Sequence, residues 1–183
     1  MSTMSFRGSL LHIHMSPAAS APMQSLAQAT LTAGLGIAED RYATRTGTYS
    51  ERHHVDRQIT LIEVESLEAL WRDRGVALQA HEHRRNLTTR GVPLNHLVGQ
   101  YFRVGDCVLY AGRLNVPCKY LENLLGKTVF RPLLNRSGVN ARVIIGGDIR
   151  PGDAIEPVEA GSLPAELVAA NEQTPVEPAP EVF

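Results

Sequence analysis

The residue with the clearest potential for chemistry is one of two cysteines. Cys118 follows Pro117 and stands at the expected start of a helix that ends at Gly126. Free N–H groups and the positive end of the helix dipole favour a thiolate at such a position, and Lys119 adds a positive charge. A thiolate can accept sulfur as a persulfide or bind a thiophilic metal. A free cysteine is also often a small buried hydrophobic residue, so both interpretations stay open.

Cys107 stands in a different setting. It opens a β-prone stretch after the turn residues Gly105 and Asp106, and no neighbouring residue would activate its thiol. We expect it to be buried in the core. Two cysteines in total, without a signal-type N-terminus, favour reduced thiols and a cytoplasmic protein.

Arginine supplies nearly all the positive charge, because Lys119 and Lys127 are the only lysines. A guanidinium group holds phosphate or carboxylate through paired hydrogen bonds, which an ammonium group cannot do. In the segment RRNLTTRG, a strand would place four polar residues on one face: Arg84, Asn86, Thr88 and Arg90. Arg85 would lie on the other face. Such a polar face can bind an oxyanion, and an ordinary solvated face fits the pattern equally well.

Other loops hold residues able to complete an oxyanion site. Arg41, Arg136 and Arg142 are the candidates. Asp40 would either orient a guanidinium group or form a turn, as aspartate commonly does. A pterin cofactor with a terminal phosphate is one ligand that such a group of arginines would suit.

The histidines offer a different interpretation. Six of them form three close pairs: His12 and His14, His53 and His54, and His81 and His83. Residues two apart share one face of a strand, and paired imidazoles can contribute to a zinc site. No third ligand stands at metal-binding spacing beside any pair. We therefore favour ordinary surface or packed histidines and keep the zinc site as the weaker alternative.

The bulk properties exclude several classes of partner. The net charge of -1 and the pI of about 6.7 predict no general attraction to nucleic acid or to a membrane surface. No apolar run approaches the roughly 20 residues that span a bilayer. Gly146 and Gly147 form an isolated pair without a phosphate-loop or dinucleotide-binding pattern, which disfavours a nucleotide-binding enzyme.

Several short stretches have the alternation or the β-branched content of strands. They cover residues 11–15, 57–62, 85–89, 101–104, 107–111 and 139–145, with further short strands through Ile155. About seven strands with few helices predict a mainly β, β-rich α+β fold that is closed or nearly closed into a barrel. Residues 23–33 fit either a helix or a strand.

The most regular helical pattern covers residues 63–74. Gly75 would end this helix, and its apolar stripe would consist of Val64, Leu67, Leu70 and Trp71. Residues 39–54 are too hydrophilic for the core and predict a long loop, a kind of segment that often carries function.

The composition predicts one domain and a tail. A chain of 183 residues with 43% hydrophobic content is long enough for one buried core. We place that domain at residues 5–158. Residues 159–183 are rich in Ala, Glu and Pro and predict a flexible C-terminal tail, apart from a helical turn near residues 163–170.

Five segments occur in an order that is typical of one family. They are GIAEDRY from Gly36, RQITLIEVESLEAL from Arg57, RRNLTTRGVPLNHLVGQYFRVGD from Arg84, PCKYLE from Pro117 and GGDIRPGD from Gly146. Together they resemble the MOSC family, the molybdenum cofactor sulfurase C-terminal domains, in its small stand-alone bacterial form. The resemblance covers residues 11–156. Two positions depart from the family pattern, because Glu39 replaces a usual Gly and Ser137 stands where Arg-Gly-Gly is common.

The resemblance implies a β-barrel of the MOSC and pyruvate kinase β-barrel-like type and a link to molybdenum cofactor chemistry. It makes Cys118 the expected catalytic residue, either as a sulfur (persulfide) carrier or as a molybdenum ligand. The anionic pterin-type cofactor, molybdopterin, would then be held by a set of polar residues: Arg85, Asn86, Arg90, Arg41, Asp40 and Arg136.

The resemblance also bears on partners. In full sulfurases a separate pyridoxal-phosphate domain supplies the sulfur, and this chain has no room for one. We therefore expect a separate cysteine desulfurase or a molybdoenzyme as partner, and no pyridoxal phosphate on either lysine. An enzymatic role would be that of a molybdenum cofactor-dependent oxidoreductase or a sulfur-transfer protein. The alternatives are a barrel that binds an oxyanion or another small ligand without chemistry of its own, and the histidine zinc site.

Overall fold

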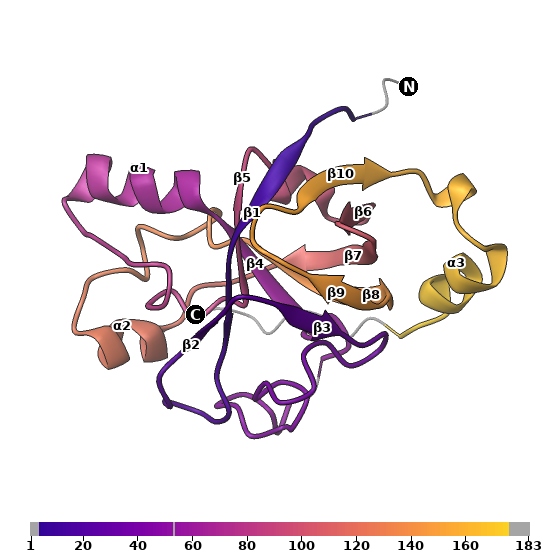
Figure 1. The fold of residues 1–183 in the computed structure, drawn as a ribbon. Coiled ribbons are helices and arrows are strands. Elements are labelled where there is room, and N and C mark those ends of the chain that lie inside the picture. The colour runs from indigo at the N-terminus through magenta and orange to yellow at the C-terminus, as the bar shows by residue number, and fades with distance from the viewer. Residues whose placement is uncertain (1–3, 53, 176–183) are drawn as a thin grey trace.

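The computed structural model of this protein describes residues 4–52 and 54–175 (Figure 1). Its strands are β1 (Gly8–Met15), β2 (Gln24–Leu26), β3 (Ala29–Leu31), β4 (Ile59–Glu63), β5 (Leu87–Arg90), β6 (Tyr101–Val104), β7 (Cys107–Leu114), β8 (Val139–Ile145), β9 (Gly147–Ile149) and β10 (Ala154–Val158). Its α-helices are α1 (Val64–Arg74), α2 (Lys119–Leu125) and α3 (Ala165–Glu172), and the short 3₁₀ helices are η1 (Leu94–Leu97) and η2 (Ala160–Ser162).

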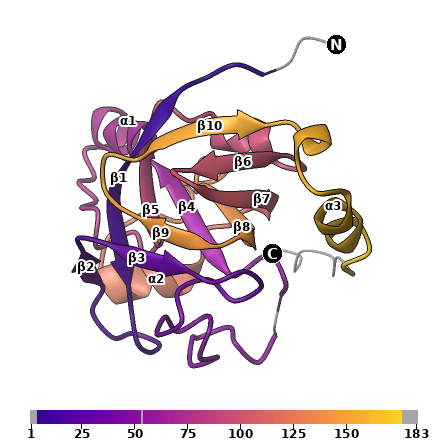
Figure 2. The same cartoon turned by 45° about the vertical axis from the view of Figure 1, so that its right-hand side comes forward.

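The main sheet closes on itself. Its strands follow the order β10-β6-β7-β8-β4-β5-β1-β2, and β1 also pairs with β10 through Gly8 and Ile155. Seven strands of the described chain therefore form a closed barrel, which leaves those strands without a free edge (Figure 2). Only β4 and β5 pair in parallel, and the other pairs are antiparallel. The predicted mainly β fold and its barrel closure are confirmed.

Two apolar clusters hold the barrel and its helices together. The larger fills the barrel interior and includes Leu10, Leu61 and Phe102. The smaller lies outside the barrel, where α1 and α2 cover it, and includes Ile62 and Leu70. Because Leu61 belongs to the first cluster and Ile62 to the second, β4 is buried on both faces. This explains why the four residues from 59 to 62 are all buried.

The predicted helix over residues 63–74 is confirmed as α1, but its apolar stripe is narrower than expected. Leu67 and Leu70 are buried, whereas Trp71 is 61% exposed. Successive residues of an α-helix lie about 100° apart, so Trp71 turns away from the face that Leu70 buries. Gly75 ends the helix in the left-handed conformation, as predicted.

The segment over residues 23–33, which the pattern did not resolve, forms β2 and β3. β2 pairs with β1, and β3 pairs with β9 in a separate two-stranded sheet. In β1, a register shift between Leu10 and His12 places both Leu10 and Ile13 in the core. Strict alternation from Leu11 did not predict this irregularity.

The segment after residue 158, for which we expected a flexible tail, contains η2 and α3 in its described part. The predicted helical turn corresponds to α3, which runs on to Glu172. Asn171 is buried and hydrogen-bonded to the barrel. Residues 176–183 lie outside the described residues, and the boundary of the barrel domain at residue 158 stays a prediction.

No helix within residues 4–52 and 54–175 has both the length and the apolar character needed to cross a membrane.

Gly138 is expected to tolerate no side chain, because its backbone lies against β4. Its φ is +86°, and an added Cβ would lie 1.7 Å from the carbonyl oxygen of Leu61. Gly138→Ala should therefore lower the free energy of unfolding by roughly 3 kcal/mol, combining backbone strain with overpacking. Urea denaturation measures this loss. Gly126→Ala is the control, since Gly126 has a similar φ of +61° but no atom of the described residues would lie within 4 Å of an added Cβ. A loss of stability in Gly138→Ala no larger than that in Gly126→Ala would contradict the close approach of Gly138 to Leu61.

Candidate functional site

Cys118 lies where the segment after β7 turns into α2. It is the N-cap residue of α2, is half-buried, and packs against the smaller apolar cluster. The hydroxyl of Tyr49, from the long loop that begins at residue 39, lies close enough to the Cys118 thiol to interact with it. The Arg85 guanidinium is close enough for its charge to interact with the same sulfur. The thiol therefore lies between an apolar wall and a polar one.

Tyr49 forms the outer side of this polar wall. Its ring meets the Tyr120 ring edge to face at a centroid distance of 6.4 Å, and 46% of the residue is exposed. Burial, followed by the hydrogen bond to the Cys118 thiol, raises the pKa of Tyr49 to about 12. Tyr49 is therefore protonated at neutral pH, and its O–H can donate to the sulfur.

Arg57 extends the polar wall, and Arg113 lies near Arg57. Arg57 stacks over the Tyr49 ring at 5.9 Å, and its Nη1 donates to the Tyr49 carbonyl oxygen at 3.1 Å. Arg113 is close enough to Arg57 for the two charges to repel, and burial with this repulsion lowers the pKa of Arg113. The Nε and Nη2 atoms of Arg113 are buried without a hydrogen-bond partner in the described chain. These unpaired donors would suit an anion.

Sequence reasoning missed Tyr49, Tyr120, Arg57 and Arg113 as parts of this site. Arg57 precedes β4 and Arg113 lies near the end of β7, so no common sequence segment joins them. The run of arginines in the long loop and its flanks was the available signal. The contact of Arg57 with Tyr49 could not be predicted, because it depends on how the loop packs on the barrel.

Arg85 is buried, and its donors already have partners in the protein. Its Nη1 donates to the His83 carbonyl oxygen at 2.7 Å, and its Nη2 donates to Ser137 Oγ at 2.5 Å. Its Nε lies 3.3 Å from the Ser137 carbonyl oxygen. Burial lowers the pKa of Arg85. Arg85 thus holds the loop before β8 in place and provides a fixed positive charge near Cys118.

Asp40 is the centre of a buried hydrogen-bond network rather than a surface residue. Its carboxylate accepts from the backbone N–H groups of Ser16 and Tyr42, from Arg41 Nη1 and from Asn86 Nδ2, at 3.0–3.1 Å. Asp40 is only 1% exposed. The expectation that residues 39–54 are too hydrophilic for the core was therefore wrong for Asp40 and Arg41. Their complete hydrogen bonds offset the energetic cost of burying these two charged groups.

Arg41 and Asn86, both predicted to bind the cofactor, belong to the same network. Arg41 Nη2 donates to the Arg84 carbonyl oxygen at 2.8 Å, and its guanidinium stacks on the Tyr42 ring at 4.2 Å. Asn86 Oδ1 accepts from both the backbone N–H and the hydroxyl of Thr60. The structure thus brings Asp40, Arg41 and Asn86 together, with their polar groups paired to one another and to the barrel.

Arg90 and Arg136 lie apart from this network and pair with α1. Arg90 forms an exposed ion pair with Glu68 at 2.6 Å, and Arg136 forms one with Asp73 at 3.2 Å. The RRNLTTRG face is also not a solvated surface, since Asn86 and Thr88 are fully buried. β5 lies between β1 and β4 in the barrel, and its first three residues are buried, so both of its faces are covered there.

Two of the three histidine pairs meet in space. The His12 and His14 rings are 6.1 Å apart, and those of His14 and His83 are 6.4 Å apart. His83 Nδ1 accepts from the Arg85 backbone N–H, and its Nε2 is 2.9 Å from Thr88 Oγ1. Within the described residues, no three His, Cys, Asp or Glu side chains are arranged to hold a metal ion, so the zinc site has no support. His53 lies outside the described residues.

The buried His83 predicts a loss of stability on mild acidification. Burial, together with the Arg85 charge, holds the pKa of His83 well below 6.5. As pH falls below about 6.5, the unfolded chain binds a proton that the folded chain does not, so stability falls by up to about 1.4 kcal/mol per pH unit. Stability is fully present above that pH. Urea denaturation between pH 7.5 and 5.5 should show this slope, reduced in His83→Asn and unchanged in the exposed His12→Asn. Equal slopes in all three proteins would contradict it.

Comparison with known proteins identifies the fold and a family model. The family model described as "MOSC domain" matches residues 20–156. The structure is similar to the YUAD protein from Bacillus subtilis, with 18% identity, a TM-score of 0.67, and coverage of 84% of this chain and 98% of that one. It is also similar to YiiM from Geobacillus stearothermophilus, with 16% identity, a TM-score of 0.65, and coverage of 88% and 81%. YiiM from Escherichia coli is similar as well, with 17% identity, a TM-score of 0.59, and coverage of 86% of this chain and 71% of that one. No curated protein sequence gives a significant match.

Proposed function

This chain belongs to the MOSC domain family, which is associated with molybdenum cofactor sulfurase-type proteins, and we propose that Cys118 is its reactive residue. We propose that the thiol either carries sulfur as a persulfide or binds molybdenum, beside a site for the anionic part of a pterin-type cofactor. The observation that carries the proposal is the contact of a half-buried Cys118 thiol with the Tyr49 hydroxyl, next to the Arg85 charge.

The residues present fit an anionic cofactor with a soft metal centre. Cys118 supplies a thiolate, the type of ligand that a thiophilic metal prefers. Arg113 offers two buried donors that have no hydrogen-bond partner among the described residues, and Arg57 adds a second guanidinium group near it. These two arginines would hold the phosphate. When bound, the molybdenum centre would supply the redox chemistry.

Among the residues first predicted to hold the cofactor, Arg85, Arg41, Asn86 and Asp40 have a supporting role in this proposal. Their hydrogen bonds tie Asp40 and Arg41 to the residue that precedes β5 and tie Arg85 to the segment before β8. Arg57 and Arg113 then take the role of direct anion contact. Arg90 and Arg136, which pair with α1, have no part in it.

As a sulfur carrier, Cys118 would receive sulfur from a persulfide on a separate cysteine desulfurase. The Cys118 thiolate attacks the terminal sulfur of the donor persulfide, and a new S–S bond forms as the old one breaks. The donor cysteine leaves as a thiolate, so one neutral sulfur atom moves and no net oxidation occurs. Tyr49 would donate its O–H to the thiolate and hold the sulfur at the open side of the site.

The setting we propose is the cytoplasm, with a desulfurase or a molybdoenzyme as partner. Both cysteines are free in the structure, which suits a reducing compartment. The two cysteines also lie in different parts of the fold, which argues against an internal disulfide. Cys107 belongs to the cluster inside the barrel, and Cys118 packs against the smaller cluster outside it.

The proposal is tested by incubating the purified protein with a cysteine desulfurase and cysteine, and by measuring its intact mass and metal content. We expect the gain of one sulfur atom on the peptide that contains Cys118, or stoichiometric molybdenum after exposure to the cofactor. The absence of both the sulfur adduct and bound molybdenum would overturn the proposal. A phosphate-dependent rise in melting temperature that persists in Cys118→Ser, with no adduct, would instead favour a binding module without chemistry of its own.

A further inference from the structure

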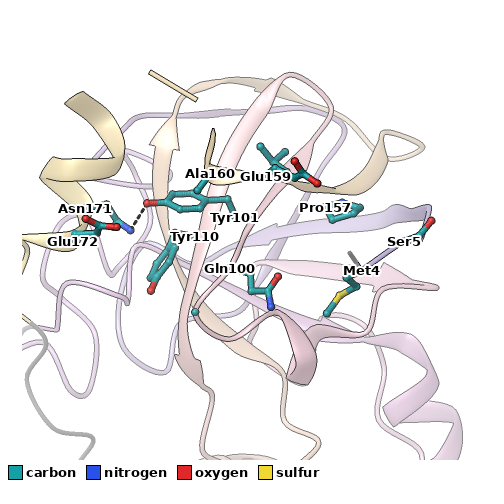
Figure 3. A pocket seen from close by; sticks show the side chains of 12 residues that line it. Met4, Ser5, Gln100, Tyr101, Tyr110, Pro157, Glu159, Ala160, Asn171 and Glu172 are labelled. Atoms are coloured by element: carbon teal, nitrogen blue, oxygen red, sulfur yellow. Dashed lines mark hydrogen bonds between the residues drawn. The ribbon is translucent and has the colours of Figure 1, made fainter. Parts of the chain in front are cut away.

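We propose that a cavity beside α3 is a second ligand site and that it takes a small organic cation with an apolar part. The cavity has a volume of about 830 Å³, within the usual range for sites of small molecules. Its walls come from the N-terminal segment, the start of β6, the middle of β7, the end of β10 and α3 (Figure 3). The cavity is lined in part by α3, which lies on the opposite side of the barrel from α2 (Figure 1).

Two tyrosines give the cavity its aromatic wall. Tyr101 and Tyr110 are paired across β6 and β7, and their ring centroids are 5.0 Å apart at an interplanar angle of 56°. Tilted aromatic rings present π faces and edges to the same space, as sites for organic cations do. Met4 and Pro157 add apolar surface on the opposite side. The cavity can therefore hold a hydrocarbon part as well as a charge.

The charged residues that line the cavity favour a ligand with a positive charge. Glu159 and Glu172 line the cavity, whereas no Lys, Arg or His of the described residues does. The guanidinium group of Arg142 stacks on the Tyr110 ring at 5.4 Å. Its charge is balanced by Asp56, whose carboxylate accepts from Arg142 Nε at 2.6 Å. A cation is therefore favoured over an anion in this cavity.

The position of α3 is held by buried polar contacts rather than by apolar packing alone. Asn171 Nδ2 donates to the Tyr101 hydroxyl at 2.9 Å, as Figure 3 shows. Arg142 Nη1 donates to both the carbonyl oxygen and Oδ1 of Asn171, at 3.1 and 2.9 Å. Because Asn171 is both the anchor of α3 and part of the cavity wall, the shape of the cavity is set before a ligand arrives.

The experiment uses 2-phenylethylamine, which is a cation at neutral pH, as the probe. Its uncharged analogue 2-phenylethanol and its anionic analogue 3-phenylpropionate have the same ring and a similar length. Titrations of the full chain, followed by the NMR shifts of the Tyr101, Tyr110 and Asn171 signals, should show the cation binding at least about tenfold more tightly than either analogue. Equal affinity for the neutral analogue, or shifts that map elsewhere, would overturn the proposal.

Matched variants separate the cavity from a general charge effect. The double variant Glu159→Gln, Glu172→Gln should weaken binding of the cation about tenfold. Glu166→Gln removes one carboxylate charge at an exposed position of α3, outside the cavity lining, and should leave binding unchanged. Equal losses in both proteins, or none in the double variant, would overturn the proposal. Cys118→Ser should bind the cation as the wild type does, so failure of the proposed function would leave this result untouched.

Discussion

Cys118→Ser is expected to lower sulfur loading by at least about 100-fold, to the background of the assay. A serine hydroxyl stays protonated at neutral pH and forms no persulfide, so neither sulfur transfer nor binding of a soft metal survives the change. The free energy of unfolding should change by less than about 0.5 kcal/mol, because Cys118 is half-buried at the start of α2 and the hydroxyl can accept the Tyr49 hydrogen bond. Mass spectrometry of loaded protein and urea denaturation measure the two effects.

Cys107→Ser is the matched control for that result. Cys107 is fully buried in the barrel, and burial raises the pKa of its thiol to about 11. This substitution should leave sulfur loading intact while costing about 1–3 kcal/mol of stability, since it buries a hydroxyl group. Sulfur that remains on Cys118→Ser, or that disappears with Cys107→Ser in folded protein, would contradict the assignment of the reactive thiol.

Asp40→Ala is expected to lower the free energy of unfolding by about 3–5 kcal/mol. It leaves the buried Arg41 guanidinium without its carboxylate, and it removes the acceptor of the Ser16 and Tyr42 N–H groups and of Asn86. The loop that carries Tyr49 should loosen as a result, so amide exchange over residues 39–52 should accelerate. Urea denaturation and hydrogen exchange measure the two effects.

Asp148→Ala serves as the comparison for Asp40. Asp148 also accepts hydrogen bonds from side chains, those of Gln28 and Thr30, but it is exposed to water. We expect a loss below about 1 kcal/mol, because water replaces the lost partner. Similar losses for the two variants would contradict the view that Asp40 is a buried structural centre.

The local pattern was sufficient to predict the elements of the barrel. The strands over residues 101–104 and 139–145 were predicted with the bounds that the structure has, because glycine turns or β-branched runs mark their ends. The helix after β4 and its end at Gly75 were also predicted. Barrel closure followed from the number of short strands and from the resemblance to the MOSC family.

The arrangement of polar residues could not be predicted in the same way. Asp40 and Arg41 read as surface residues in the sequence, yet each is buried by partners that are 20 or more positions away, such as Asn86 and Arg84. Burial of a charge depends on whether distant groups complete its hydrogen bonds, and no local periodicity records that. For the same reason the sequence did not predict the buried donors of Arg113, which lies in the same strand as Tyr110, a residue of the cavity at α3.

The most direct test of the account is the rate at which Cys118 reacts with iodoacetate, an anion, relative to iodoacetamide, its neutral analogue. If the thiol is reachable from water and guanidinium groups line its approach, the ratio of the two rates should exceed that of free cysteine by about tenfold at low salt. It should fall toward the free-cysteine value at high salt or in Arg57→Gln and Arg113→Gln. A ratio equal to that of free cysteine at every salt concentration, or a folded protein in which Cys118 does not react, would contradict the account.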